Sequence, residues 1–343
     1  MREVARDTID VMNGEESTIE KAAASAAKHS GPPRVSVIVP TRNGVAWLAR
    51  LIEALERQTL PRAAFELVVG DDGSTDNPGR FATRDDWVRV VSGPPTNSYA
   101  ARNRAVASAR GDVLAFCDAD CFPEPDWLER GVEALKDADL VAGRIRFSVP
   151  ERYTVWTLID MEWAKNHEAE VKQGVAETAN LFLLRELFER IGGFDETIDE
   201  HGDFDFVERC VAAGERLVYG PRAAVSHPTR ENGRAVLRAQ WIYCRGYAER
   251  VTARGELPDG LKLRNWIPVV WVVRARRGNK VSLLGPDSAW LAENGVRPTV
   301  LERLKSLPII YLIIPYTRAL AQLQGWLRGR RRRAVLAVGE PVR

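Results

Sequence analysis

Short apolar runs rich in β-branched residues recur in the first part of the chain, and polar residues follow them. Their length and composition are typical of strands buried on both faces, at residues 34–39, 65–69, 88–91 and 113–117. Helical patterns lie between them, an amphipathic one at residues 45–55, with Asn43 placed to cap its first turn, and another at 100–109. Strands that alternate with helices in this way predict a parallel sheet with right-handed crossovers.

Polar motifs stand at the ends of three of these predicted strands. They are Pro-Thr-Arg-Asn at residues 40–43, Asp-Asp-Gly-Ser at 71–74 and Asp-Ala-Asp at 118–120. Each motif by itself is typical of a turn. The carboxyl ends of parallel strands converge on one edge of an open α/β sheet, where ligands bind. Three such motifs together therefore indicate a single binding site at that edge.

The residue types in these motifs suit a phosphorylated ligand. Asp118 and Asp120 are two residues apart at a strand end, as suits a hard divalent cation that also holds phosphate oxygens; a solvated acidic turn is the alternative. Arg102 near the start of a helix is placed to meet a phosphate, or is an exposed helix charge. The chain has neither the glycine fingerprint of a dinucleotide-binding fold nor a P-loop.

Composition places the chain among ordinary globular proteins. Its 343 residues are 45% hydrophobic and 28% charged, which excludes a disordered, collagen-like or polytopic membrane protein. Four scattered cysteines are too few for a disulfide framework and indicate reduced, partly buried thiols in a cytosolic protein. Residues 1–33 have no signal-peptide pattern, and we expect them to form a flexible extension.

Charge divides the chain unevenly, although the net charge is only +2. Residues 305–343 hold eight Lys and Arg against one acid, a net charge of +7 that leaves −5 for the remainder. In this tail an apolar run at 307–316 precedes a stripe of Leu320, Leu323 and Leu327 and a run of arginines. That combination predicts an interfacial helix on an anionic membrane, and residues 266–277 repeat it. Core or docking helices are the alternative, and nucleic-acid binding is disfavoured because no recognised module accompanies the arginines.

The motifs, in this order, resemble those of the family 2 glycosyltransferases. The resemblance covers about residues 33–247 and includes Gly-Gly-Phe-Asp-Glu at 192–196 and Asp-Phe-Asp at 203–205. It implies the GT-A fold, a Rossmann-like α/β architecture with a mixed, mainly parallel sheet flanked by helices. The pattern of the tail adds a C-terminal amphipathic helical extension. The expected parts are the flexible extension at 1–33, the glycosyltransferase domain at 34–250 and a basic, membrane-associated helical extension at 251–343.

The resemblance assigns the first motifs to the nucleotide of a UDP- or GDP-linked sugar donor. Pro40, Thr41 and Asn43 would shape the nucleotide pocket. Asp72 would contact the base, and Arg102 would lie near the nucleotide and its phosphates.

Metal and sugar contacts follow from the later motifs. The resemblance implies that Asp118 touches the ribose or the water shell of the metal, and that Asp120 ligates Mg²⁺ or Mn²⁺. His227 matches a histidine that often follows a strand in such enzymes, here expected at 216–219, and would complete the metal shell. Glu177 and Asn180 are candidate donor-sugar contacts, with plain structural roles as the alternative.

The expected catalytic base is Asp203, because an inverting transfer needs one carboxylate to accept the proton of the acceptor hydroxyl. The family has Glu-Asp-x-Asp/Glu at this place, whereas the Glu position here is Gly202. This departure leaves Asp205 as the second candidate and Glu200 as the third. Capping of the following helix is the structural alternative for Asp203.

The sequence thus predicts a metal-dependent, inverting glycosyltransferase that moves a single sugar to a glycan or lipid-linked acceptor. The Gln-x-x-Arg-Trp motif of processive synthases is absent, and the expected location is the cytoplasmic face of the cell membrane. A sugar nucleotidyltransferase lacks support because its glycine-rich and basic opening loop is missing. A phosphatase of the haloacid dehalogenase type would carry Asp-x-Asp on its first strand. A membrane-bound scaffold without catalytic activity is the remaining alternative.

Overall fold

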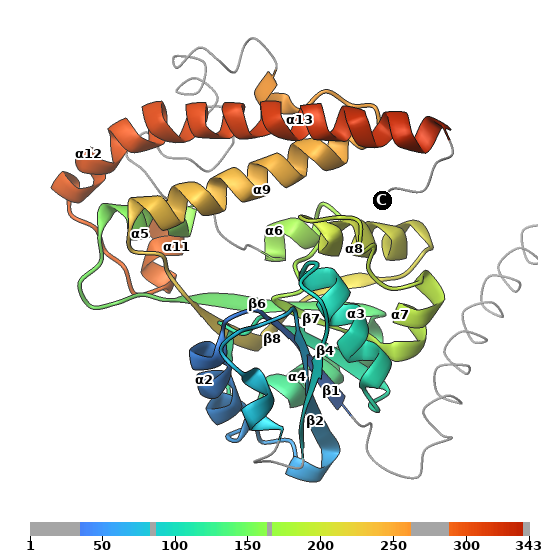
Figure 1. The fold of residues 1–343 in the computed structure, drawn as a ribbon. Helices are drawn as coiled ribbons and strands as arrows, with labels where there is room; N and C mark the ends of the chain where they lie inside the picture. The colour runs from blue at the N-terminus through green and yellow to red at the C-terminus, as the bar shows by residue number, and fades with distance from the viewer. Residues whose placement is uncertain (1–34, 83–86, 163–166, 262–287, 339–343) are drawn as a thin grey trace, which may run out of the picture.

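The computed structural model describes residues 35–82, 87–162, 167–261 and 288–338 (Figure 1). Its strands are β1 (Val35–Thr41), β2 (Phe65–Asp71), β3 (Val88–Ser92), β4 (Val113–Cys117), β5 (Phe122–Pro123), β6 (Leu140–Ser148), β7 (Asn180–Leu184) and β8 (Leu217–Pro228). They form one sheet in the order β3-β2-β1-β4-β7-β6-β8-β5. The parallel pairing predicted for the first four strands is confirmed, and β7 joins them antiparallel to β4.

Helices cover both faces of this sheet and continue into a C-terminal layer (Figure 1). The α-helices are α2 (Val45–Leu55), α3 (Ser98–Ser108), α4 (Trp127–Ala134), α5 (Val155–Glu162), α6 (His167–Val171), α7 (Arg185–Ile191), α8 (Gly202–Ala212), α9 (Gly233–Ala253), α11 (Ser288–Glu293), α12 (Val300–Pro308) and α13 (Ile314–Val338). Short 3₁₀ turns lie at Arg62–Ala64, Pro78–Phe81, Leu135–Asp137 and Asp259–Leu261. A π-helical turn at Ile309–Ile313 joins α12 to α13.

Alternation along the buried strands divides the apolar side chains between two cores. Val35, Val37 and Val39 pack with α2 and α4, whereas Ile38 packs on the opposite face with α3, α7 and α8. Successive residues of a strand point to opposite faces, so a strand covered on both sides must be apolar throughout. This explains why the strands read as continuous apolar runs in the sequence.

The strand β8 is longer than the sequence predicts. The expected strand at 216–219 continues to Pro228 after an irregularity in which residues 221–223 have no partner opposite Gly143 and Arg144 of β6. Pro221 lacks an N–H and cannot donate to the ladder, which explains why the sequence pattern breaks there. The expectation that His227 follows the strand is therefore wrong: His227 is part of β8 itself.

The C-terminal helix α13 lies along α9, in the same direction across the molecule (Figure 1). Gly325 and Gly329 make the close approach possible, since a Cβ atom there would lie 2.1 Å from the carbonyl oxygen of Arg245 and 2.7 Å from that of Glu249. Among the described residues, no helix combines the length and apolar character that a membrane crossing requires. The sequence also predicted a flexible extension at residues 1–33 and a second membrane-interface segment at 266–277. Both regions lie outside the described residues.

Candidate active site

The turn after β1 is held by side chains from the turn after β2. Asn43 has a left-handed backbone (φ 54°), and its Oδ1 accepts a hydrogen bond from the backbone N–H of Thr75 at 2.8 Å. The sequence suggested that Asn43 caps α2, but its side chain does not do so. Instead, the Oδ2 atom of Asp76 accepts a hydrogen bond from the backbone N–H of Val45 at 2.9 Å. Of the predicted nucleotide residues, Pro40 and Thr41 thus end β1, and Asn43 lies on the following turn, which the Asp-Asp-Gly-Ser region fixes in place.

Asp72 is buried at the same edge of the sheet. Its Oδ1 accepts a hydrogen bond from the backbone N–H of Thr96 at 2.7 Å, and its two oxygens lie 3.7 Å from a guanidinium nitrogen of Arg42 and 3.9 Å from one of Arg104. The backbone N–H of Asp72 also donates to the carbonyl oxygen of Thr41 at 2.9 Å. The ends of β1 and β2 are therefore one connected surface, as the convergence of parallel strands predicts.

Arg102 and Asp118 form an ion pair at 2.6 Å between α3 and the end of β4. The Arg102 side chain is only 5% exposed, and its Nε atom has no hydrogen-bond partner within the described chain. The hydroxyl of Thr41 is likewise buried without a partner there. Buried polar atoms without partners are costly, so two of them beside the predicted nucleotide site are consistent with a bound polar ligand.

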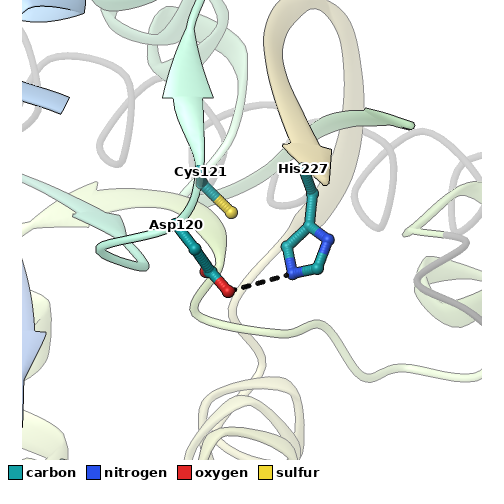
Figure 2. Close-up of side chains that lie close together, drawn as sticks. All are labelled: Asp120, Cys121 and His227. Carbon is teal, nitrogen blue, oxygen red and sulfur yellow. Dashed lines mark ion pairs between the residues drawn. The ribbon is translucent and has the colours of Figure 1, made fainter. Parts of the chain in front are cut away.

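Asp120, Cys121 and His227 form a candidate metal centre (Figure 2). One ligand atom from each of these residues lies within 4.8 Å of the others, and the Nε2 atom of His227 is 3.5 Å from the Oδ2 atom of Asp120. His227 is 3% exposed, and its Nδ1 atom has no partner among the described residues. Sequence reasoning proposed Asp120 and His227 but missed Cys121, which it treated as an ordinary buried thiol although it directly follows the Asp-x-Asp motif.

Asp203 lies in the first turn of α8, and its carboxylate accepts hydrogen bonds on both oxygens. The hydroxyl of Tyr99 donates to Oδ1 at 3.2 Å, and the backbone N–H of Thr178 donates to Oδ2 at 3.2 Å. Burial raises the pKa of Tyr99 well above its usual range, so its phenol stays protonated and can donate. Asp203 is not the N-cap of α8, since that position is His201.

The two other candidate bases have different surroundings. Asp205 binds Arg209 through a 3.0 Å ion pair along the same helix. Burial raises the pKa of Glu200 from 4.5 to about 7, although Arg245, at 3.6 Å, acts in the opposite direction. A Cβ atom on Gly246 of α9 would lie 2.3 Å from the Cβ atom of Glu200, so this glycine allows the loop before α8 to pack against α9.

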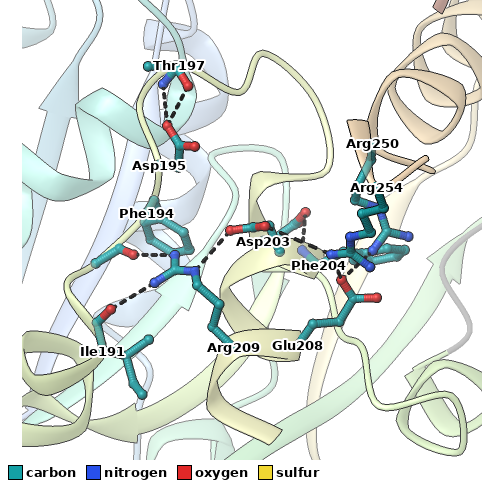
Figure 3. Close-up of polar contacts among 12 residues, drawn as sticks. Ile191, Phe194, Asp195, Thr197, Asp203, Phe204, Glu208, Arg209, Arg250 and Arg254 are labelled. Atoms are coloured by element: carbon teal, nitrogen blue, oxygen red, sulfur yellow. Dashed lines mark hydrogen bonds and ion pairs between the residues drawn. The ribbon is translucent and has the colours of Figure 1, made fainter. Parts of the chain in front are cut away.

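Arg209 and Glu208 fix α8 on its two sides (Figure 3). Arg209 donates to the carbonyl oxygens of Ile191 at 2.8 Å and Gly193 at 2.6 Å, which ties α8 to the Gly-Gly-Phe-Asp turn. Glu208 pairs with Arg250 of α9, at 2.7 Å, and with Arg254, which directly follows this helix. These contacts give the Gly-Gly-Phe-Asp motif a structural purpose: the turn anchors the helix that carries Asp203.

A cavity of about 700 Å³ lies beside Asp203 and α9. Four sequence-predicted residues line it, namely Glu177, Glu200, Asp203 and His227. Asp205 is not among the lining residues, and the predicted nucleotide residues also lie outside this cavity. Most of the sequence-predicted residues therefore lie either at the strand-end edge or in the cavity, and His227 links the two through Asp120; Asp205 and Asn180 belong to neither group.

Asn180 is engaged in internal contacts. Its Oδ1 atom accepts from the indole N–H of Trp127 at 2.9 Å, and its Nδ2 atom donates to the carbonyl oxygens of Arg144 at 2.9 Å and Ala223 at 3.0 Å. The residue is fully buried. These contacts favour the structural role that the sequence left open for this residue.

Comparison with known proteins decides the family. The model of glycosyl transferase family 2 matches residues 36–192. Glycosyltransferase AglE of Haloferax volcanii is 33% identical over 214 residues, which are 59% of this chain and 69% of AglE. The chain belongs to glycosyltransferase family 2. The match contains the strand-end edge, and the resemblance seen in the sequence is therefore confirmed.

Further relatives of this family 2 glycosyltransferase include the pre-mycofactocin glycosyltransferase of Mycobacterium tuberculosis. It is 30% identical over 233 residues, which are 62% of this chain and 47% of that enzyme. The chain thus spans about half the length of the mycobacterial relative and about two thirds of AglE.

A solved structure supports the expected fold. Mannosyltransferase PcManGT from Pyrobaculum calidifontis, solved in complex with GDP-Man and Mn²⁺, matches with a TM-score of 0.54 and 22% identity, over 85% of this chain and 88% of that one. At this identity the likeness concerns the fold. The glycosyltransferase has a GT-A-like mixed sheet flanked by helices, and the C-terminal helices that the sequence predicted are present.

Proposed function

We propose that this family 2 glycosyltransferase transfers a single sugar, with inversion, from a nucleotide-sugar donor to a hydroxyl group of a glycan or lipid-linked acceptor. The observation that carries the proposal is the place of Asp203, in one cavity with His227, whose imidazole lies 3.5 Å from Asp120. A candidate base and a candidate metal ligand therefore line one cavity beside the predicted nucleotide edge.

The donor would lie along the strand-end edge. Thr41 and Arg102 offer buried polar atoms that have no partner in the described chain, and Asp72 is oriented by the backbone N–H of Thr96. Arg102 supplies a fixed positive charge beside Asp118, which suits a phosphate nearby. Mannosyltransferase PcManGT was solved with GDP-Man, which supports a nucleotide sugar as the donor class.

Asp120, Cys121 and His227 would hold a divalent cation. Carboxylate, thiolate and imidazole ligands together suit Mn²⁺ better than Mg²⁺, which prefers oxygen ligands alone. Such a cation, when bound, stabilises the negative charge of the leaving diphosphate. The Mn²⁺ in the PcManGT structure supports a metal of this kind.

Asp203 would act as the general base. Its carboxylate accepts the proton of the acceptor hydroxyl while that oxygen forms a bond to the anomeric carbon, and the bond from this carbon to the nucleoside diphosphate breaks. Tyr99 and Thr178 hold the carboxylate by both oxygens, so its orientation toward the cavity is fixed before the acceptor arrives. The ion pair with Arg209 makes Asp205 less suited to this role.

The C-terminal helices would place the enzyme on an anionic membrane surface. α13 packs on α9 with one side and exposes Tyr316, Leu320, Leu323 and Leu327 on another. Arg328, Arg330 and Arg331 follow these residues and are exposed. An apolar face next to arginines is typical of a helix that lies in the membrane interface.

Calorimetry on the full chain tests the proposal, with UDP and GDP titrated in the presence and absence of Mn²⁺. We expect one of the two nucleotides to bind only when the metal is present, and Asp203→Asn to keep this binding while transfer is lost. Asp205→Asn serves as the matched control and should keep both. Absent or metal-independent binding of both nucleotides would contradict the proposal and favour a scaffold without catalytic activity.

A further inference from the structure

A buried histidine outside the predicted motifs bridges two segments close to Asp203. His167 belongs to α6, and its side chain has no exposed surface. Its Nδ1 atom lies 2.7 Å from the carbonyl oxygen of Gly143 in β6, and its Nε2 atom lies 3.1 Å from the backbone nitrogen of Glu177. His167 therefore connects the sheet to the segment that precedes β7.

The partners of His167 determine where its ring carries hydrogen. A carbonyl oxygen can only accept, so Nδ1 is protonated and donates to Gly143. The backbone N–H of Glu177 can only donate, so Nε2 has a free lone pair and accepts. The carboxylate of Glu170 lies 3.7 Å from Nε2, which is beyond hydrogen-bond distance. His167 is thus a neutral imidazole with its hydrogen on Nδ1.

Gly143 lies where the pairing of β6 with β8 becomes irregular. A Cβ atom at this position would be 2.4 Å from the carbonyl oxygen of Ala223 and 2.4 Å from the Nδ2 atom of Asn180, so the close approach requires a glycine. Asn180 binds to the same part of the sheet, since its Nδ2 atom donates to the carbonyl oxygen of Ala223 at 3.0 Å. His167 and Asn180 thus fix both ends of residues 177–180 to one irregular region.

The segment between these two contacts donates a hydrogen bond to the candidate base. The backbone N–H of Thr178 donates to the Oδ2 atom of Asp203 at 3.2 Å, and Thr178 is buried. Each peptide unit is planar and shares a Cα atom with the next, so the direction of the Glu177 N–H constrains that of the Thr178 N–H. Loss of the His167 contact would therefore loosen one of the donors that orient the carboxylate.

We propose that His167 is a positioning residue for the glycosyl transfer, because it holds Glu177 in the direction that lets Thr178 orient Asp203. This inference rests on the proposed function, in which Asp203 accepts the proton of the acceptor hydroxyl. His167 itself adds no proton transfer, since it is fully buried and is not among the residues that line the cavity. Its contribution is to the rate and not to donor binding.

Two variants separate the two contacts of His167. The amide of a glutamine reaches the position of Nε2 in histidine, and the amide of an asparagine reaches that of Nδ1. His167→Gln can therefore still accept from the N–H of Glu177, whereas His167→Asn can still donate to Gly143. Each variant loses one buried hydrogen bond, so each is the matched control for the stability of the other.

Amide hydrogen exchange on the full chain gives a readout that requires no substrate. We expect His167→Asn to accelerate exchange at Glu177 and Thr178 at least about tenfold relative to Leu183 of β7, because both amides lose protection against local opening. In His167→Gln, exchange at the two amides should stay within about threefold of the wild type. The ¹⁵N shifts of the His167 ring in the wild type test the tautomer directly, and we expect a protonated Nδ1 and an unprotonated Nε2 at neutral pH.

Nucleotide release measures the effect on the reaction. The probes are UDP-glucose and GDP-mannose with Mn²⁺, with water as the acceptor, and the released UDP or GDP is quantified. We expect His167→Asn to lower kcat about tenfold and to leave KM for the donor within about twofold, since only the orientation of the base changes. His167→Gln should keep kcat within about threefold of the wild type.

Three results would overturn the inference. Equal effects of the two variants on amide exchange and on kcat would show that His167 only fills space. Faster exchange at Glu177 with unchanged exchange at Thr178 would show that the contact does not reach Asp203. A charged ring, or one with its hydrogen on Nε2, would remove the acceptor for Glu177. Failure of the proposed function has a different signature: the wild type would release neither UDP nor GDP, while exchange at Thr178 would still decide whether His167 holds this segment.

Discussion

Tyr99 donates a hydrogen bond from its hydroxyl to the Oδ1 atom of Asp203, at 3.2 Å. The two residues are 104 positions apart in the sequence, on α3 and α8. The ring of Tyr99 also packs against that of Phe194 in the Gly-Gly-Phe-Asp turn, with 5.6 Å between ring centroids. The helix α3 thus orients the candidate base on α8.

Tyr99→Phe tests this relationship. The variant keeps the buried ring but removes the donor, so the carboxylate loses one of its fixed contacts. Because a hydrogen bond to a charged group contributes about 1.5–3 kcal/mol, we expect kcat to fall about tenfold or more. KM for the donor and Mn²⁺-dependent nucleotide binding should stay within about twofold, since the donor edge is unchanged. An equal loss in nucleotide affinity would instead point to a structural role for the hydroxyl.

Asp120→Asn and His227→Gln test the metal centre. We expect each variant to weaken Mn²⁺-dependent nucleotide binding at least about tenfold, because each removes one ligand of the cation. Asp137→Asn, an exposed carboxylate away from the site, is the matched control.

Cys121→Ser tests the third ligand separately. If the sulfur contributes, the wild type binds the nucleotide more tightly with Mn²⁺ than with Mg²⁺, and the serine variant reduces this preference because its hydroxyl is a harder ligand. Identical metal preference in the two proteins would show that Cys121 is only a buried thiol.

Glu200 should make the stability of the fold depend on pH. Its pKa is 4.5 in a solvated chain and about 7 in the folded protein, chiefly because of burial. The folded state therefore binds the proton more tightly, and the free energy of unfolding decreases as pH rises from about 4.5 to 7. After allowance for solvent screening of this partly exposed group, the decrease is about 2 kcal/mol.

Glu200→Gln should remove this decrease, because the side chain no longer ionises. Urea unfolding at pH 5, 6, 7 and 8 measures it, with the exposed Glu189→Gln as the control. Parallel stability curves for the wild type and Glu200→Gln would contradict the expectation.

The exposed face of α13 can be tested without removing the helix. Truncation would uncover α9, which α13 covers through Gly325 and Gly329, so point variants are preferable. We expect Leu320→Ser/Leu327→Ser to reduce flotation with anionic liposomes about tenfold or more, because each exposed leucine contributes about 1 kcal/mol of membrane contact. Leu184→Ser/Val211→Ser, two exposed apolar residues elsewhere, is the matched control. Equal flotation of the two variants would remove the membrane assignment.

Local sequence patterns were sufficient to predict much of the fold and the polar residues of the strand-end edge. The runs that became β1, β2 and β4 are apolar because both faces of the sheet are covered, and their polar ends meet because parallel strands converge. The same logic could not find the irregularity at residues 221–223, since it depends on which strand lies opposite. Nor could it find the capping role of Asp76, which comes from a loop 31 residues away from Val45.

The sequence by itself determined the family, the alternation of strands and helices, and the acidic residues at the strand ends, because each is a short-range pattern with a fixed physical meaning. Only the tertiary structure decided that Cys121 joins Asp120 and His227, that Tyr99 orients Asp203, and that His167 bridges Gly143 and Glu177. These relationships join residues from different elements, and packing fixes their distances. The C-terminal tail illustrates this difference. Its apolar stripe and its arginines are visible in the sequence, but only the packing of Gly325 against α9 shows which side of α13 is buried and which is exposed.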